Sequence, residues 1–113
     1  MSAACDLAQF LSAARPTLTV VSGPAAGMEY VLDQRRVLIG RGPGVDLVLD
    51  ESLERVHVAL DYDRSVFRVV SLSAGILEVN GAAVVQCDLK DGDRLSLGGV
   101  RLVYSLESGP SAL

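Results

Sequence analysis

The stretch VLIGRGPGVDLVLDESLERVH, residues 37–57, decides the fold expected for this chain. It opens with an apolar run typical of a buried strand, which stops at Gly40 and Arg41. A second apolar run ends in acidic residues, and Glu54 and Arg55 then precede another apolar strand. Basic side chains therefore stand where strands meet loops. An arginine fork in such a place suits bidentate contact with phosphate or carboxylate.

Length and composition limit the classes of protein that the chain can represent. Its 113 residues, 50% of them hydrophobic, suffice for one domain that buries roughly two thirds of its unfolded surface. No apolar run reaches the ~18 residues of a membrane helix, and the N-terminus lacks the features of a secretory signal. Cys5 and Cys87 show no metal or redox spacing, so we expect both to be reduced. These features predict a soluble, cytoplasmic protein without membrane insertion.

The charged and nucleophilic residues argue against an enzyme. The net charge of −4 disfavours a nucleic-acid surface, which needs clustered positive charge. His57 is the only histidine, and it has no Cys or carboxylate companions at metal-ligand spacing. The glycine-rich residues 40–44 lack the Lys-Ser/Thr pair of a nucleotide loop, and no nucleophile has a base beside it. We therefore expect no catalysis, no metal and no cofactor.

The rest of the chain alternates between short strand-like runs and turn signals. The runs that predict hairpins are residues 58–62 with 66–70, residues 76–79 with 83–86, and residues 94–97 with 100–106. Between the runs of the second hairpin, Asn80 and Gly81 suit a type I′ turn, because both tolerate positive φ. Many short strands without helices between them predict an all-β antiparallel sandwich.

The two ends of the chain differ from this pattern. Residues 1–16 form an N-terminal segment in which Leu7, Phe10, Leu11 and Ala14 have helical spacing. This segment is expected to form a short helix packed on the sandwich or a frayed terminus. The alternative is a docking helix for a partner or a second copy of the chain, which would give a homodimer. Residues 17–106 are then the sandwich domain, and residues 107–113 a flexible tail.

Several motifs, in this order and spacing, resemble those of the forkhead-associated (FHA) domain. They are Ile39-Gly40-Arg41, Asp46-Leu47-Val48-Leu49-Asp50, Arg55-Val56-His57, Val79-Asn80-Gly81 and Asp91-Gly92-Asp93. The resemblance covers residues 17–106 and implies an FHA-like (SMAD/FHA) β-sandwich of about eleven strands. It also implies binding of phosphothreonine peptides through loops at one end. In that family the residue matching His57 is a scaffold residue that pins a loop by hydrogen bonds. We expect Gly40, Asn80 and Gly81 to be structural as well, Asn80 and Gly81 because of their turn chemistry.

The candidate phosphopeptide-binding residues implied by the resemblance are Arg41, Glu54, Arg55, Ser73, Ala74 and Gly75. Two of these positions depart from the family pattern. Glu54 stands where the family has a serine that donates a hydrogen bond to phosphate. In the second loop, Ala74 or Gly75 replaces an asparagine that contacts the peptide backbone.

The replacement at Glu54 has a physical cost for phosphate binding. An ionised carboxylate cannot donate a hydrogen bond. It would also repel a phosphate roughly 5 Å away by on the order of 5 kcal/mol at an effective dielectric near 20. A hydrogen bond from one arginine to the phosphate stabilises the complex by only ~1.5 to 3 kcal/mol. We hypothesise that Glu54 instead forms an ion pair with Arg41 or Arg55; the alternative is an exposed loop acid.

Three functions are consistent with these residues. The first is a non-catalytic FHA-type interaction module in bacterial signalling or assembly, in which phosphothreonine recognition is weakened or lost because of Glu54. The second is a phosphothreonine-peptide adaptor in a Ser/Thr-kinase pathway. The third is a structural or oligomerisation domain, similar to those of secretion-system ring proteins. In each case we expect a protein or phosphoprotein partner.

Overall fold

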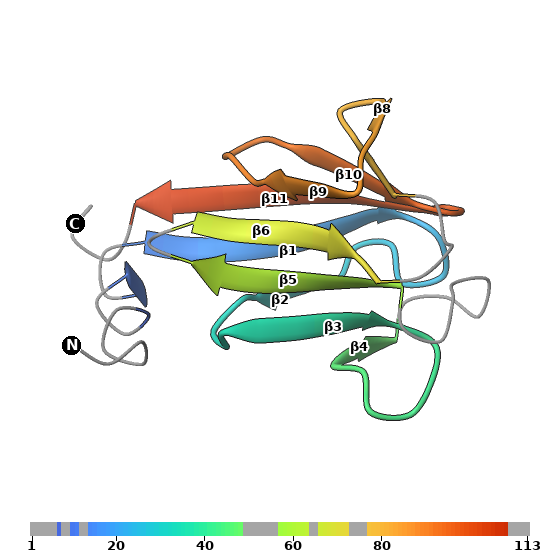
Figure 1. The fold of residues 1–113 in the computed structure, drawn as a ribbon, viewed down its shortest axis with the longest axis horizontal. Helices are drawn as coiled ribbons and strands as arrows, with labels where there is room; N and C mark the ends of the chain where they lie inside the picture. Colours follow the sequence, from blue (N-terminus) through green and yellow to red (C-terminus); the bar gives the residue numbers. More distant parts are fainter. Residues whose placement is uncertain are drawn as a thin grey trace.

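Two β-sheets pack face to face in the computed structural model (Figure 1), which describes residues 7, 10–11, 14–48, 57–63, 66–72 and 77–108. Its strands are β1 (Ala14–Ser22), β2 (Glu29–Val31), β3 (Arg36–Gly40), β4 (Leu47–Val48), β5 (Val58–Asp63), β6 (Val66–Ser71), β7 (Leu77–Val79), β8 (Ala82–Ala83), β9 (Gln86–Asp88), β10 (Arg94–Leu97) and β11 (Val100–Ser108). The all-β sandwich expected from the sequence is confirmed, with eleven strands among the described residues.

One sheet has the strand order β2-β1-β11-β10-β7-β8, and the other has the order β4-β3-β5-β6-β9. Neighbouring strands in each sheet are antiparallel except for β3 and β4, which are parallel. The hairpins β5-β6 and β10-β11 form as the sequence predicts. Both have turns that are local in sequence, so short-range signals suffice to set their register.

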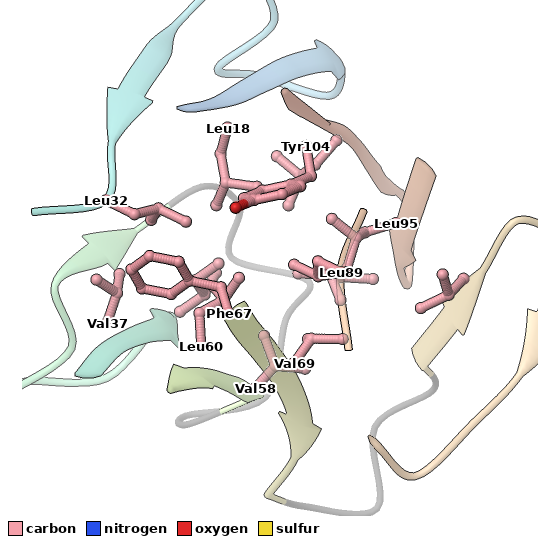
Figure 2. Close-up of a cluster of buried hydrophobic side chains, with 14 of the residues drawn as sticks. Leu18, Leu32, Val37, Val58, Leu60, Phe67, Val69, Leu89, Leu95 and Tyr104 are labelled. Atoms are coloured by element: carbon pink, nitrogen blue, oxygen red, sulfur yellow. The ribbon is translucent and has the colours of Figure 1, made fainter. Parts of the chain in front are cut away.

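The core lies between the two sheets and is made by the inward side chains of each strand. Figure 2 shows Leu18 and Tyr104 of the six-stranded sheet facing Leu60 and Phe67 of the five-stranded sheet. All four are at most 1% exposed. Burial of each such side chain contributes about 1.5–3 kcal/mol, so the alternation of apolar and polar residues drives the two sheets together.

The predicted N-terminal helix is not supported, because no helix can be delimited among the described residues. Leu7, Phe10 and Leu11 have helical backbone geometry, and their side chains pack on the protein's own core. The ring centroid of Phe10 lies 5.3 Å from that of Tyr62 and 6.1 Å from that of Phe67. Tyr62 lies near the C-terminal end of β5, so these contacts are at that end. The candidate binding residues are grouped near the other end, where β5 starts after His57. Dimerisation through this segment stays a prediction.

The boundaries of the sandwich are wider than the sequence predicted. β1 begins at Ala14, and β11 ends at Ser108, with Ala14 opposite Ser108 and Pro16 opposite Leu106. A proline disfavours helical geometry in the residue before it, so Arg15 extends the strand. Residues 14–16 and 107–108 therefore belong to the sandwich, not to the flanking segments.

The second predicted hairpin is shorter than expected. Asn80 and Gly81 have φ of 54° and 86°, so the predicted left-handed turn is confirmed. Only β8 pairs with β7, however, and β9 crosses to the other sheet and pairs with β6. The crossing places Leu89, 4% exposed, in the core. Burial of this leucine accounts for a switch that no turn signal marks.

Candidate functional site

His57 holds together the three strand ends that carry the candidate binding loops. Its backbone N–H donates to the carbonyl of Ile39 (2.8 Å), and its carbonyl accepts from the N–H of Leu72 (3.1 Å). Ile39 lies two residues before Arg41, and Leu72 directly precedes Ser73. His57 itself is 3% exposed. The end of β3, the start of β5 and the end of β6 thus lie together, at the tip of β3 in Figure 1.

The loop that carries Arg41 is closed onto its own strand by Asp46. The N–H of Leu38 donates to Oδ2 of Asp46 (2.7 Å), and the N–H of Asp46 donates to the carbonyl of Leu38 (2.8 Å). Gly40 and Gly42, on either side of Arg41, are buried, whereas Arg41 is exposed. Arg41 is therefore presented to solvent from a short loop whose two ends are hydrogen-bonded together.

Arg41 forms no ion pair within the part of the chain that the structure describes. The ion pairs found there join Arg36 to Asp61, and Arg68 to Asp88 and Asp63. An exposed guanidinium without an internal partner can contact an external anion without first breaking a salt bridge. This is the property that a phosphate-contacting or carboxylate-contacting arginine needs.

The remaining candidate contact residues lie outside the described residues. They are Glu54, Arg55, Ser73, Ala74 and Gly75. The structure places the anchors of their loops, Val48 and His57 on one side and Leu72 and Leu77 on the other. The ion pair of Glu54 with Arg41 or Arg55 stays a prediction.

Asn80, a structural residue in the sequence-based interpretation, links the β7–β8 turn to β10. Its Nδ2 donates to Oδ1 of Asp93 (3.0 Å), and its Oδ1 accepts from the N–H of Arg94 (3.0 Å). Oδ2 of Asp93 also accepts from the N–H of Lys90 (2.8 Å). Asn80 and Gly81 thus serve the sheet and do not join His57 at the loop end.

The sequence reasoning missed the role of Asp46. This residue was quoted only as part of a motif, yet its carboxylate and its backbone both clamp the Arg41 loop. The signal was available in principle, since an aspartate between a glycine-rich loop and a short strand commonly accepts a backbone hydrogen bond.

The titratable residues outside the loop site form no metal site among the residues that the structure describes. Among the described residues, no group of three or more His, Cys, Asp or Glu side chains could hold a metal ion. Cys87 is a half-buried free thiol on β9. Burial, with a smaller contribution from the Asp91 charge, raises the pKa of Tyr104 to about 12. No helix in the described part of the chain has the length and apolar character needed to span a membrane.

Comparison with known proteins agrees with this geometry. Residues 19–107 match a family model described as the cytoplasmic domain of an inner-membrane component of the type III secretion system. The chain is similar to the glycogen accumulation regulator GarA of Mycobacterium tuberculosis, at 35% identity over 89 residues. That match covers 77% of this chain and 55% of GarA, so the chain spans about half the length of this relative.

Two further matches cover most of the length of the protein that is matched. The oxoglutarate dehydrogenase inhibitor of Corynebacterium efficiens is 32% identical over 108 residues, 90% of this chain and 72% of that protein. An FHA domain, solved in an analysis of phosphothreonine-dependent FHA domain interactions, superposes with a TM-score of 0.72 at 30% identity. That superposition covers 80% of this chain and 95% of the solved one. The chain therefore belongs to the forkhead-associated domain family, and within it matches the type III secretion cytoplasmic-domain group.

Proposed function

We propose that this chain is a non-catalytic protein-interaction module that contacts its partner through the loops around Arg41, with an affinity for phosphothreonine lowered by Glu54. The observation that carries the proposal is Arg41 itself. It is exposed, it lacks an ion-pair partner among the described residues, and Asp46 fixes its loop. A fixed loop loses little conformational freedom on binding, which favours recognition.

The chemistry at position 54 supports a weakened phosphate contact. In the sequence, Glu54 lies between β4 and β5, three residues before His57, and it stands where the family has a hydroxyl donor, so it introduces a negative charge there. A neutral or cationic partner group is compatible with that carboxylate, whereas a phosphate is repelled by it. Arg41 and Glu54 together suit a partner segment that offers both an acceptor and a donor.

The relatives support an interaction role. GarA is named a regulator and the Corynebacterium protein an inhibitor, and the solved FHA domain belongs to a study of phosphothreonine-dependent interactions. We infer that this chain likewise works inside the cell on a protein partner, phosphorylated or not.

Titration of a phosphothreonine peptide library tests the proposal. The wild type is expected to bind weakly, Glu54→Ser to bind about tenfold or more tightly, and Arg41→Ala to lose binding, since ~1.4 kcal/mol is a tenfold change. Arg36→Gln serves as the matched control, because Arg36 is an exposed arginine already paired with Asp61. Tight wild-type binding that Glu54→Ser does not improve would favour the second candidate, a phosphothreonine adaptor.

The family match favours one further role, as a structural domain within an assembly. The matching group is described as the cytoplasmic domain of a secretion-system component. Light scattering over a range of concentrations tests whether the chain self-associates. A constant monomer mass would count against a homo-oligomeric role and leave the partner-binding role in place.

A further inference from the structure

The outer face of the six-stranded sheet carries two arginines on adjacent strands. In β10, Arg94 and Ser96 point outward while Leu95 is buried, and in β11, Arg101 points outward while Leu102 is buried. The pairing register sets Arg94 opposite Val103, and Ser96 opposite Arg101. The two arginines are therefore diagonal neighbours on one face, at positions about 7–8 Å apart.

These arginines line a groove on that face. The groove has a volume of about 710 Å³, and its lining includes Arg94, Arg101, Glu78, Ser96, Val21 and Val103. Val21 is 52% exposed, so part of the lining is apolar surface open to solvent. A groove lined by apolar side chains together with a small number of charged groups is typical of a ligand-binding site.

Neither arginine is neutralised within the described part of the chain. No ion pair there involves Arg94 or Arg101, although Arg36 and Arg68 on the other sheet are both paired. Among the described residues, Glu78 is the one carboxylate in the groove lining, and Ser96 lies between it and Arg101 in the register. The groove thus has a local positive excess on a chain whose net charge is −4.

We propose that this groove binds an extended acidic segment of a partner protein, in which two carboxylates two residues apart contact Arg94 and Arg101. Residues two apart on an extended strand point to the same side and lie about 6.7 Å apart, which matches the diagonal spacing of the two arginines. Each carboxylate can accept two parallel hydrogen bonds from one guanidinium. Charge complementarity therefore selects the spacing of the acidic residues as well as their sign.

The other groove residues narrow the peptide sequences that the groove is expected to prefer. Glu78 repels a third carboxylate placed over Ser96, which lies directly opposite Glu78 in the register, and Val21 and Val103 accept a small apolar side chain. Two arginines beside one glutamate are too few to hold a nucleic acid, whose binding depends on the neutralisation of many phosphates. The preferred ligand is a short acid-x-acid segment flanked by small or β-branched residues.

This site is distinct from the loop site of the proposed function. Arg41 is not among the residues that line the groove, and Arg94 and Arg101 are not among the candidate loop residues. Substitutions can therefore separate the two. Arg41→Ala is expected to leave the acidic-peptide affinity unchanged, and the double variant Arg94→Gln/Arg101→Gln to leave any phosphothreonine-peptide affinity unchanged.

Titration with the labelled peptide Gly-Thr-Glu-Val-Glu-Thr-Gly tests the proposal, with fluorescence anisotropy for affinity and amide chemical shifts for location. We expect shift changes on β10 and β11, centred on Ser96 and Val103. Arg94→Gln and Arg101→Gln should each weaken binding about tenfold, the loss typical of one charged hydrogen-bonding group. Raised salt should weaken binding as well.

The controls use the same chain and the same peptide backbone. Arg36→Gln, an exposed arginine on the opposite sheet, is expected to bind like the wild type, and the matched Gln-Val-Gln peptide is expected not to bind. The proposal is overturned if the Gln peptide binds equally well, or if the double arginine variant keeps its affinity. It is also overturned if shifts appear only near Arg41, or if none appear at millimolar peptide.

Discussion

The outer faces of the two sheets differ in whether their arginines form ion pairs. On the five-stranded sheet, the register aligns Arg36, Asp61, Arg68 and Asp88 in one row across β3, β5, β6 and β9. Arg36 Nε lies 2.7 Å from Asp61 Oδ1, and Arg68 Nε lies 2.6 Å from Asp88 Oδ1. These hydrogen bonds raise the pKa of both arginines. We call this row the charge ladder.

The six-stranded sheet has no such ladder among its described residues. Its outward arginines, Arg94 and Arg101, face a groove and form no ion pair in the described part of the chain. A ligand that approached the charge ladder would have to compete with internal carboxylates, whereas the groove offers unpaired guanidinium groups. The comparison indicates that one face serves the fold and the other serves recognition.

The largest effect is expected beneath both faces, where the two sheets share one core. Leu60 of β5 and Leu102 of β11 are each 1% exposed. Leu60→Ala and Leu102→Ala should each lower the free energy of unfolding by about 2–5 kcal/mol, measured by urea denaturation. Val85→Ala, at a 74% exposed position, is the control and should cost little. A small loss for either leucine would contradict its place in the shared core, and two separate transitions in urea would show that the sheets unfold separately.

A second prediction concerns the strand that carries Arg101 on its outer side and Tyr104 toward the core. Burial raises the pKa of Tyr104 from 10.0 to about 12, so the folded state keeps the phenol proton after the unfolded state has lost it. This contribution to stability is complete below pH 10 and is lost as pH rises from 10 to 12. The loss should reach about 3 kcal/mol.

Urea denaturation at a series of alkaline pH values measures this dependence. Tyr104→Phe should flatten the stability curve above pH 10, whereas Tyr30→Phe, at a half-buried position on β2, should leave it steep. Equal slopes in the wild type and in Tyr104→Phe would contradict the assignment.

A smaller effect is expected at the rim of the groove. Asn80 combines φ of 54° with hydrogen bonds to Asp93 and Arg94. Asn80→Ala should cost about 1–2 kcal/mol, because it loses these bonds and because alanine tolerates a left-handed conformation less well than asparagine does. Asn80→Gly should cost less, since glycine tolerates this φ. If the glycine variant is the less stable of the two in thermal unfolding, the conformational explanation is wrong.

The smallest expected effect is a difference in stability between arginine substitutions on the two outer faces. Arg68→Gln removes the contacts with Asp88 (2.6 Å) and Asp63 (3.9 Å), so it should lower the urea midpoint slightly, and more at low salt than at high salt. Arg101→Gln should leave the midpoint unchanged at either salt concentration. Equal destabilisation by both substitutions would mean that the groove arginine also serves the fold.

Much of the fold could be predicted because its signals are local. The hairpin through Gly98 and Gly99 and the turn at Asn80 and Gly81 follow from turn chemistry and two-residue alternation. The switch of β9 to the other sheet could not be predicted. It depends on the burial of Leu89 against residues distant in sequence.

Only part of the candidate site could be predicted, because local motifs reveal single residues but not contacts between residues distant in sequence. Arg41 was found because it follows an apolar strand within a recognisable motif, but the clamp by Asp46 emerged only from the hydrogen bonds. Arg94 and Arg101 were each visible on a predicted strand. Their shared groove was not, because it also requires β1 and β7 to flank the hairpin.

The amino-acid sequence by itself determined an all-β chain, its main hairpins, the family resemblance and a cation at a strand end, since each depends on residues close together in the chain. Only the tertiary structure decided which charges neutralise each other. Arg36 and Asp61 are 25 positions apart, yet they pair because the register of β3 and β5 aligns them. Register is a property of the packed sheets, and it is what leaves Arg94 and Arg101 available to a partner.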